Sequence, residues 1–195
     1  MRVAFDLDGV LADFAGAYAA VARRLRPSGS ENVSEESPEG GLERRVWRAI
    51  ETTRDFWTTL DPVEPELIGR LHDRTVRGRW DTFFVTQRPP TAGDSVQLQT
   101  QRWLVAQGFP LPAVIVHRGP RGPLAAALEL DFLVDDTVEH CVDVLERSRA
   151  SPVFVCREPD SARQTNAKQL GIAVCRSTTG ALARLVQPRI RVGPA

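Results

Sequence analysis

Short apolar runs alternate along the chain with segments whose apolar positions recur every three or four residues. The apolar runs predict strands, at residues 3–7, 82–86, 113–117, 132–135, 153–156 and 172–175. Helical spacing follows most of these runs, as at residues 97–107 and 138–149, where Thr137 is a predicted N-cap. Strands that alternate with helices predict an α/β fold, with a parallel sheet covered by helices on both faces.

One interval, roughly residues 13–79, is much longer than the dozen or so residues that a crossover between parallel strands needs. Helical spacing inside it predicts a small helical cap, with helices at residues 15–25, 42–53 and 65–76. The predicted domains are therefore a core at residues 1–13 and 79–187 and a cap at residues 14–78. Residues 27–41 lack aromatic side chains and favour a mobile loop, and residues 188–195 are expected to form a loose tail.

Charge and apolar content exclude several classes of partner. The chain carries 25 basic and 25 acidic residues, and its zero net charge argues against a nucleic-acid polymer as partner. No apolar run approaches the length of a membrane span, and the N-terminus lacks the parts of a signal peptide. We therefore expect a soluble, cytoplasmic protein with no membrane partner. Cys141, Cys156 and Cys175 are scattered and are interpreted as buried free thiols.

The first predicted strand ends in two carboxylates, Asp6 and Asp8, followed by Gly9. Ligands bind at the carboxyl ends of parallel strands, and a bend at Gly9 lets both side chains face the same way. Carboxylate oxygens suit Mg²⁺, and a carboxylate beside that cation can attack phosphorus. The second carboxylate can then donate and accept the proton. The alternative is a pair of solvated aspartates in a turn.

The second predicted strand ends in Thr86, followed by Gln87 and Arg88. A hydroxyl at a strand end, followed by free backbone N–H groups, can clamp a phosphate. The alternative is an ordinary turn in which the threonine caps a helix. The fourth predicted strand ends in Asp135 and Asp136. Adjacent acids after an apolar run are costly unless a cation or hydrogen-bond donors balance them, although a solvated turn is again the alternative.

In this order, FDLDGV around Asp6, Thr86, a basic residue and the Asp135–Asp136 pair resemble the four motifs of the haloacid dehalogenase-like phosphohydrolase superfamily. The resemblance covers most of the chain and implies a Rossmann-like sheet and Mg²⁺ as cofactor. By this likeness Asp6 is the nucleophile and a metal ligand, and Asp8 is the general acid/base that binds metal through its carbonyl oxygen. Asp136 is the acidic ligand of the fourth motif, supported by Asp135. An aspartate two positions after the nucleophile favours phosphatases over dehalogenases.

Three stretches, FDLDGVLADF, DFWTTLDPVEPE and FLVDDTVEH, look more specifically like the 5′(3′)-deoxyribonucleotidase group. This likeness implies a nucleoside monophosphate as substrate and places Phe14, Phe56 and Trp57 near its base, on which aromatic rings can stack. Gln87 and Arg88 complete the predicted substrate site. The alternative for the three aromatic residues is that they pack the cap against the sheet.

The third motif departs from the family pattern, in which a lysine neutralises the phosphate and the nucleophile. The segment at residues 117–124 reads HRGPRGPL, so Arg121 stands where the lysine is expected and Arg118 is the other candidate. Arginine keeps the charge but is larger and forks its donors. Because Lys168 is the only lysine among the 25 basic residues, the arginine can reflect composition with activity retained. The alternative is a weakened site, and His117 is interpreted as structural.

Together these residues predict Mg²⁺-dependent hydrolysis of a phosphomonoester through an aspartyl-phosphate at Asp6. The expected substrate is a nucleoside monophosphate or a similar small phosphorylated metabolite, which the cap would select. Arg121 motivates a second hypothesis, a catalytically weakened protein that binds phosphate compounds without efficient turnover. A third, a phosphotransferase or a phosphatase acting on a protein or a nucleic-acid end, is disfavoured by the zero net charge and the small cap.

Overall fold

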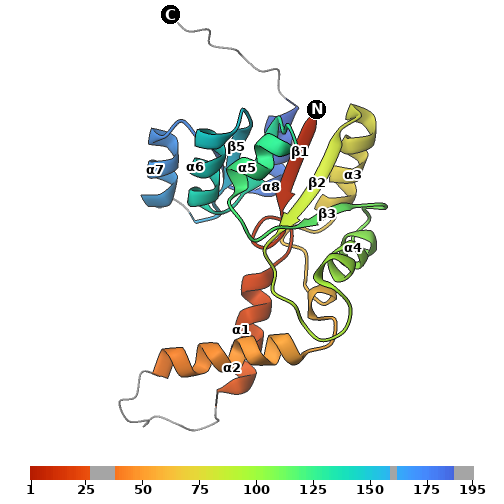
Figure 1. The fold of residues 1–195 in the computed structure, drawn as a ribbon, viewed down its shortest axis with the longest axis vertical. Helices are drawn as coiled ribbons and strands as arrows, with labels where there is room; N and C mark the ends of the chain where they lie inside the picture. The colour runs from red at the N-terminus through yellow and green to blue at the C-terminus, as the bar shows by residue number, and fades with distance from the viewer. Residues whose placement is uncertain (27–37, 159–161, 187–195) are drawn as a thin grey trace, which may run out of the picture.

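The structure is a computed structural model that describes residues 1–26, 38–158 and 162–186. Within these ranges, six strands form one parallel sheet in the order β3-β2-β1-β4-β5-β6 (Figure 1). This is the strand order of a Rossmann-like fold, so the predicted α/β class is confirmed. The strands are β1 (Arg2–Asp6), β2 (Asp81–Thr86), β3 (Ala113–Val116), β4 (Phe132–Asp135), β5 (Ser151–Val155) and β6 (Ala173–Cys175).

Along the chain, helices connect the strands, as the alternating sequence pattern predicts. Several begin at a side chain that satisfies a free backbone N–H: Asp13 caps Gly16 N at 2.9 Å, and Ser177 caps Gly180 N at 2.9 Å. The helices are α1 (Phe14–Leu25), α2 (Pro38–Thr52), α3 (Leu67–Gly78), α4 (Val96–Ala106), α5 (Arg121–Ala127), α6 (Val138–Arg147), α7 (Ala162–Gln169) and α8 (Thr178–Leu185), with a 3₁₀ turn, η1 (Phe56–Thr58).

Side chains of the central strand alternate between the two faces of the sheet. Ala4 packs in a cluster with Ala125 of α5 and Val144 of α6, whereas Phe5 belongs to a larger cluster on the opposite face, with Leu71 of α3 and other residues of α4 and α8. This period of two is what a strand imposes on its side chains. The sheet is therefore buried between two layers of helices, and its strand ends are rigidly placed.

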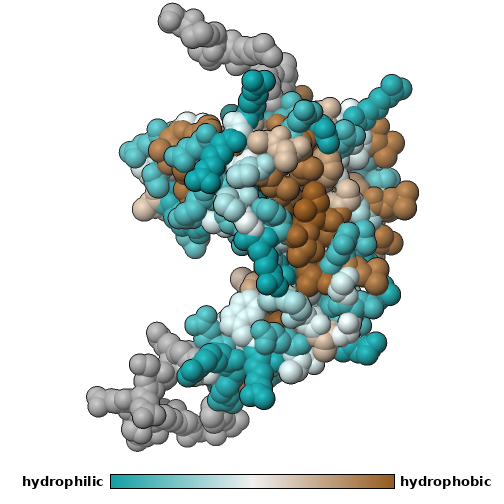
Figure 2. All heavy atoms as spheres, viewed as in Figure 1, coloured by the Kyte–Doolittle hydropathy of each residue, from teal (hydrophilic) through white to brown (hydrophobic). Residues whose placement is uncertain are grey.

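Helices α1 and α2 project away from the sheet and pack against each other, as a cap (Figure 1). The chain enters and leaves the cap at one point, where Asp13 N donates to Asp61 O at 2.8 Å and Val63 N donates to Leu11 O at 2.9 Å. Figure 2 shows the molecule hollowed between this end and the core. The predicted cap covers residues 14–78, but α3, which falls within that range, lies against the sheet beside α8.

The remaining predictions concern the loop at residues 27–41, the tail, the cysteines and membrane-spanning helices. Of the predicted loop, residues 27–37 lie outside the described ranges and the remainder is helical, because α2 already begins at Pro38, a residue that suits the first turn of a helix. The predicted tail at residues 188–195 lies outside the described ranges. The three cysteines are free thiols as predicted; Cys141 and Cys156 are buried, whereas Cys175 is only half-buried. Among the described residues, no helix is both long and apolar enough to span a membrane.

Candidate active site

The central strands β1 and β4 end in acids, and they lie where the strand order reverses. Asp6 is the last residue of β1, Asp135 is the last residue of β4, and Thr86 ends the neighbouring strand β2. Helices leave a parallel sheet in opposite directions on the two sides of such a point, which opens a crevice for ligands. The fold therefore places the residues of three predicted motifs around one crevice.

Arg121 is the basic residue that reaches Asp6. It begins α5 and is only 1% exposed, and its Nη2 donates to Asp6 Oδ1 at 2.7 Å. Its Nη1 donates to the carbonyl oxygen of His117 at 3.3 Å, while its Nε lies 3.6 Å from Asp135 Oδ2 and has no hydrogen-bond acceptor in the described structure. Arg118 is exposed. Of the two arginine candidates, Arg121 is thus the one placed at Asp6.

Asp135 is fully buried and its carboxylate already accepts several donors. Thr137 N donates to Oδ1 at 2.9 Å, and His140 Nδ1 lies 3.0 Å from Oδ2. Thr137 is the N-cap of α6 as predicted, although its hydroxyl makes no capping bond. Thr137, His140 and Arg121 thus surround the Asp135 carboxylate, and its part in metal binding stays a prediction. Sequence reasoning missed His140, whose place in the first turn of α6 was the available signal.

Asp136 lies against the loop that follows Asp8. Gly9 has φ +81°, and a Cβ there would overlap Oδ2 of Asp136, so only glycine permits this approach. Burial, followed by the negative charge of Asp135, raises the pKa of Asp136 to about 6. The Asp136 carboxylate therefore stands beside the backbone of the first motif, where Arg163 and Arg157 offset its burial and the charge of Asp135 only in part.

Asp6 is buried among acidic neighbours. Burial raises the pKa of Asp6 well above the ordinary value of 3.8; Asp135 raises it further, Arg121 lowers it, and Asp8 and Asp136 raise it again. Arg121 therefore offsets only part of the effect that burial and the neighbouring acids have on Asp6. A cation between Asp6 and Asp136 would offset the repulsion between them.

The donor set fits Mg²⁺. No three His, Cys, Asp or Glu side chains of the described residues are grouped to hold a metal ion. A magnesium site needs fewer, because Mg²⁺ keeps several waters and is commonly bound through one or two carboxylates. The carboxylates of Asp6 and Asp136 and the carbonyl oxygen of Asp8 provide hard oxygen ligands of this kind.

Thr86 and Gln87 differ in exposure. Thr86 is 1% exposed, and its Oγ1 accepts a hydrogen bond from Arg88 N at 3.2 Å. Its own O–H is still a donor, which a phosphate oxygen at the strand end can accept. Gln87 is exposed at the turn and remains a predicted substrate contact.

Arg88 does not face the substrate as predicted, because it is buried and bound to Asp8. Its side chain is 0% exposed, and Nε and Nη2 donate to the Asp8 carboxylate at distances of 2.7 to 3.1 Å. Its Nη1 donates to Thr100 Oγ1 at 3.1 Å, and its guanidinium lies 4.8 Å from the centre of the Trp57 ring. The structure therefore makes Arg88 a partner of the predicted acid/base.

The predicted base-stacking aromatics are mostly covered. Phe56 is 5% exposed and Trp57 is 1% exposed, and the Trp57 indole N–H donates to Pro89 O at 3.0 Å. These two residues pack the base of the cap against the core, which was the alternative interpretation. Phe14 is half-buried and its ring stacks on Trp47 at 5.6 Å, so a contact with substrate stays a prediction for Phe14.

Arg157 is a further residue at the site that sequence reasoning missed. Its guanidinium donates to the carbonyl oxygens of Gly9 and Val10, and to Thr178 Oγ1 at 2.9 Å. It thereby fixes the loop after Asp8, from a position 148 residues away along the chain. It also lines a cavity of about 280 Å³, together with Gly9, Asp13, Ala15, Val63, Asp136, Val155, Cys156, Glu158 and Arg163.

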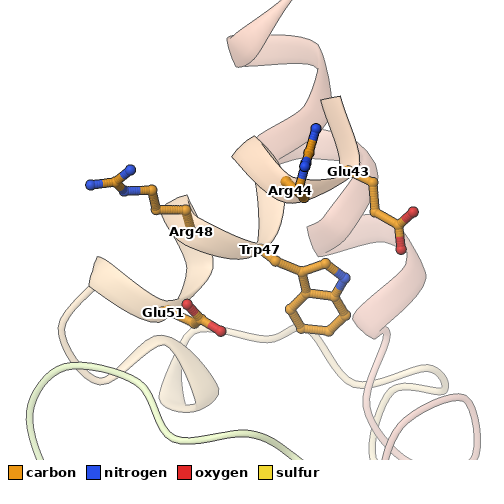
Figure 3. Close-up of a pocket in the computed structure, with 5 residues that line it drawn as sticks. All are labelled: Glu43, Arg44, Trp47, Arg48 and Glu51. Atoms are coloured by element: carbon orange, nitrogen blue, oxygen red, sulfur yellow. The ribbon is translucent and has the colours of Figure 1, made fainter. Parts of the chain in front are cut away.

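The cap carries a second hollow of about 770 Å³, on α2 (Figure 3). The side chains that line it are spaced three and four residues apart and so share one face of the helix: Glu43, Arg44, Trp47, Arg48 and Glu51. None of the predicted site residues lines this hollow, and it adds nothing to the chemistry of the crevice.

No protein-family model matches the chain, and no curated protein matches it by sequence. Solved structures do match it over nearly its whole length. A protein provisionally named a beta-phosphoglucomutase from Thermotoga maritima is 16% identical, with a TM-score of 0.60 over 95% of this chain and 99% of that one. A protein provisionally named a haloacid dehalogenase-like hydrolase, from Burkholderia xenovorans, is 16% identical, with a TM-score of 0.58 over 95% of both chains.

A third structure, a haloacid dehalogenase-like family hydrolase from Streptococcus pneumoniae, is 14% identical, with a TM-score of 0.54 over 94% of this chain and 97% of that one. At identities this low, the structural likeness establishes a common fold, and the activity has to be argued from the site itself. These three likenesses agree with the order of the strands and with the inserted cap. The chain has the fold of the haloacid dehalogenase-like hydrolases.

Proposed function

We propose that the chain is a Mg²⁺-dependent phosphomonoester hydrolase in which Asp6 is the nucleophile. The observation that carries the proposal is the contact of Arg121 with Asp6 Oδ1 at the end of β1, beside the acids of β4. Arg121 holds one carboxylate oxygen, so the other is available to attack phosphorus. The same guanidinium can neutralise a phosphoryl oxygen that arrives at the crevice.

The reaction is written in two displacements. In the first, an oxygen of Asp6 bonds to phosphorus, the bond from phosphorus to the leaving oxygen breaks, and Asp8 gives that oxygen a proton. In the second, water attacks phosphorus, Asp8 takes a proton from the water, and the bond from Asp6 to phosphorus breaks to release phosphate. Thr86 and the N–H groups after it would hold the phosphoryl oxygens in both steps.

The proposed metal ligands are the carboxylates of Asp6 and Asp136 and the carbonyl oxygen of Asp8. Bound Mg²⁺ would neutralise charge on the phosphoryl oxygens. Asp135 supports this arrangement through the donors of Thr137 and His140, which fix its place beside Asp136.

The proposed substrate is a nucleoside monophosphate or a similar small phosphorylated metabolite. The likeness of three sequence stretches to deoxyribonucleotidases and the half-buried ring of Phe14 support a nucleotide. The structural neighbour named a beta-phosphoglucomutase means that sugar phosphates belong in the same screen. A cytoplasmic location and a single small substrate, without membrane or nucleic-acid partners, are part of the proposal.

Phosphate release from a panel of phosphorylated metabolites, with and without Mg²⁺, tests the proposal. Activity should require Mg²⁺, should disappear on addition of EDTA, and should be lost in Asp6→Asn. Asp73→Asn, an exposed aspartate on α3, is the matched control and should keep full activity. An Asp6→Asn protein as active as the parent would rule the mechanism out.

The same Arg121 contact supports a second candidate, a protein that binds phosphate compounds without efficient turnover. The guanidinium forks its donors and is already paired with Asp6, which can hold the nucleophile back. Under this candidate, Arg121→Lys should create activity that the parent lacks. A parent that turns over a metabolite efficiently excludes it.

A further inference from the structure

Arg88 is a buried cation that the reaction above does not use. Its side chain is 0% exposed, whereas the carboxylate that it binds, Asp8, is 25% exposed. A buried charge needs a partner and well-placed hydrogen bonds, and removal of one member of such a pair is strongly destabilising. Asp8 is the acid paired with Arg88 in the described structure.

The geometry of the pair fixes the orientation of Asp8. Arg88 Nε lies 3.1 Å from Oδ1 and 2.9 Å from Oδ2, and Nη2 lies 2.7 Å from Oδ1. Two adjacent nitrogens of a planar guanidinium define the plane of the carboxylate as well as its position. A lysine at this place would provide a point charge without that plane.

Arg88 is itself held on two other sides. Its Nη1 donates to Thr100 Oγ1 of α4 at 3.1 Å, and its guanidinium lies over the Trp57 ring at 4.8 Å. Trp57 in turn contacts Phe14, at 5.6 Å between ring centres, and Phe56, at 5.2 Å. Phe14 is the first residue of α1, and Phe56 lies in η1, where the chain returns from the cap to the core. The base of the cap therefore supports the Arg88 guanidinium.

We propose that Arg88 is a positioning residue that aims the Asp8 carboxylate at the leaving oxygen and links its orientation to the base of the cap. This inference rests on the proposed function, in which Asp8 transfers the proton. Arg88 touches neither substrate nor phosphorus, and its effect passes through Asp8. Loss of the fork should leave nucleophilic attack by Asp6 intact while it impairs protonation of the leaving group.

Two probes with different leaving groups distinguish a loss of nucleophilic attack from a loss of leaving-group protonation. 4-Nitrophenyl phosphate releases a stable phenolate that needs no proton, whereas benzyl phosphate releases an alkoxide that does. General acid catalysis contributes about 10²- to 10⁴-fold where the proton is needed. The first turnover, measured with enzyme in excess over each probe, reports formation of the aspartyl-phosphate alone and excludes the later attack of water.

We expect Arg88→Met to slow the first turnover of benzyl phosphate about 100-fold or more, and that of 4-nitrophenyl phosphate less than tenfold. Arg88→Lys should fall between the parent and Arg88→Met on benzyl phosphate. Thr100→Val, which removes one support of the guanidinium, should shift the ratio of the two rates in the same direction by a smaller factor. Arg102→Met removes an exposed arginine on the same helix as Thr100 and is the control, with an unchanged ratio.

Equal losses on both probes would show that Arg88 acts only through folding and would overturn the inference. If Arg88→Met does not fold, as judged by circular dichroism, Arg88→Lys and Thr100→Val decide the question by the same ratio. A parent that hydrolyses neither probe in the presence of Mg²⁺ overturns the proposed function, and the inference with it.

Discussion

Arg121 Nη2 lies 2.7 Å from Asp6 Oδ1, although the two residues are 115 positions apart in the chain. Through this contact the chain, which has an arginine where the family resemblance implies a lysine, presents a positive charge to the proposed nucleophile. The planar guanidinium spans from Asp6 toward Asp135, which a single ammonium group would contact at one point. Under the proposed function, Arg121 takes the part of the lysine that the resemblance implies.

We predict that Arg121→Met lowers kcat about 100- to 1,000-fold, because a donor aimed at the developing charge is lost. Arg121→Lys should retain activity within about tenfold of the parent, since it keeps the charge. Steady-state kinetics on the best metabolite of the screen measure both. Arg118→Met, an exposed neighbour on the same loop, is the control. If Arg118→Met is the variant that loses activity, the assignment of Arg121 is wrong.

Gly9→Ala should weaken the response to Mg²⁺. A Cβ at this position overlaps Oδ2 of Asp136, so the proposed ligand has to move. We expect the Mg²⁺ concentration for half-maximal activity to rise about tenfold or more, as found when the surroundings of a metal ligand are disturbed.

Gly171→Ala is a matched control for this change. Gly171 has φ +76°, close to the +81° of Gly9, but no atom lies within 4 Å of its added Cβ. Both variants should lose about 1 kcal/mol of stability from the strained backbone, and only Gly9→Ala should alter the Mg²⁺ titration. A similar Mg²⁺ response in the two variants would show that Asp136 is not a ligand.

Glu64 gives the fold a pH dependence that can be measured. Its carboxylate accepts hydrogen bonds from Thr178 N, Thr179 N and Thr179 Oγ1, at the N-terminus of α8, and lies 3.6 Å from Arg157 Nη2. Burial raises the pKa of Glu64, but the Thr179 hydroxyl, the two backbone N–H groups and Arg157 lower it more, so the pKa falls below 4.5. A lowered pKa means that the ionised form stabilises the folded state at neutral pH.

We therefore predict that Glu64→Gln lowers the free energy of unfolding by about 1 to 2 kcal/mol at pH 7. The contribution begins to decline as the pH drops toward 4.5 and is lost as the pH falls through the folded-state pKa, so parent and variant should converge in acid. Urea unfolding at a series of pH values measures this. Glu66→Gln, an exposed residue with no capping bond, should follow the parent at every pH. A constant difference between Glu64→Gln and parent would contradict the prediction.

Trp57 is the main anchor of the cap base. It is 1% exposed and bonded to Pro89, so Trp57→Ala should cost about 3 to 5 kcal/mol of unfolding free energy. Trp47→Ala, in the same aromatic cluster but half-buried, should cost clearly less. Chemical denaturation followed by tryptophan fluorescence and circular dichroism tests the order. Equal losses would mean that the two rings contribute alike to the packing of the cap.

The sheet was predictable because buried parallel strands read as continuous apolar runs. Phe132–Asp135 was predicted with its observed bounds, and the other strands within two residues at either end. Helix α7 was not predicted, because its sequence, ARQTNAKQ, offers only alanine as an apolar residue; Gln164 and Ala167 are nonetheless buried. Its helical state depends on packing that no local pattern records.

The site was predictable as far as topology determines it. Asp6, Thr86 and Asp135 end neighbouring strands, so any parallel sheet of this order brings them to one edge. The pairing of Arg88 with Asp8, across 80 residues, depends instead on which side-chain donors meet after folding. Arg88 was therefore expected at the substrate, since an arginine after a phosphate clamp gives no sign in sequence that it turns inward.

The backbone bonds from Asp13 to Asp61 and from Val63 to Leu11 bring the entrance and exit of the inserted segment together. The outer part of an insert anchored in this way can be lengthened, trimmed or exchanged without altering the spacing of the strands that it interrupts. Because Phe14, Phe56 and Trp57 lie inside the insert and support Arg88, these three residues have to stay when the rest changes. New selectivity can thus evolve, or be engineered, in the part of the insert beyond these aromatic residues.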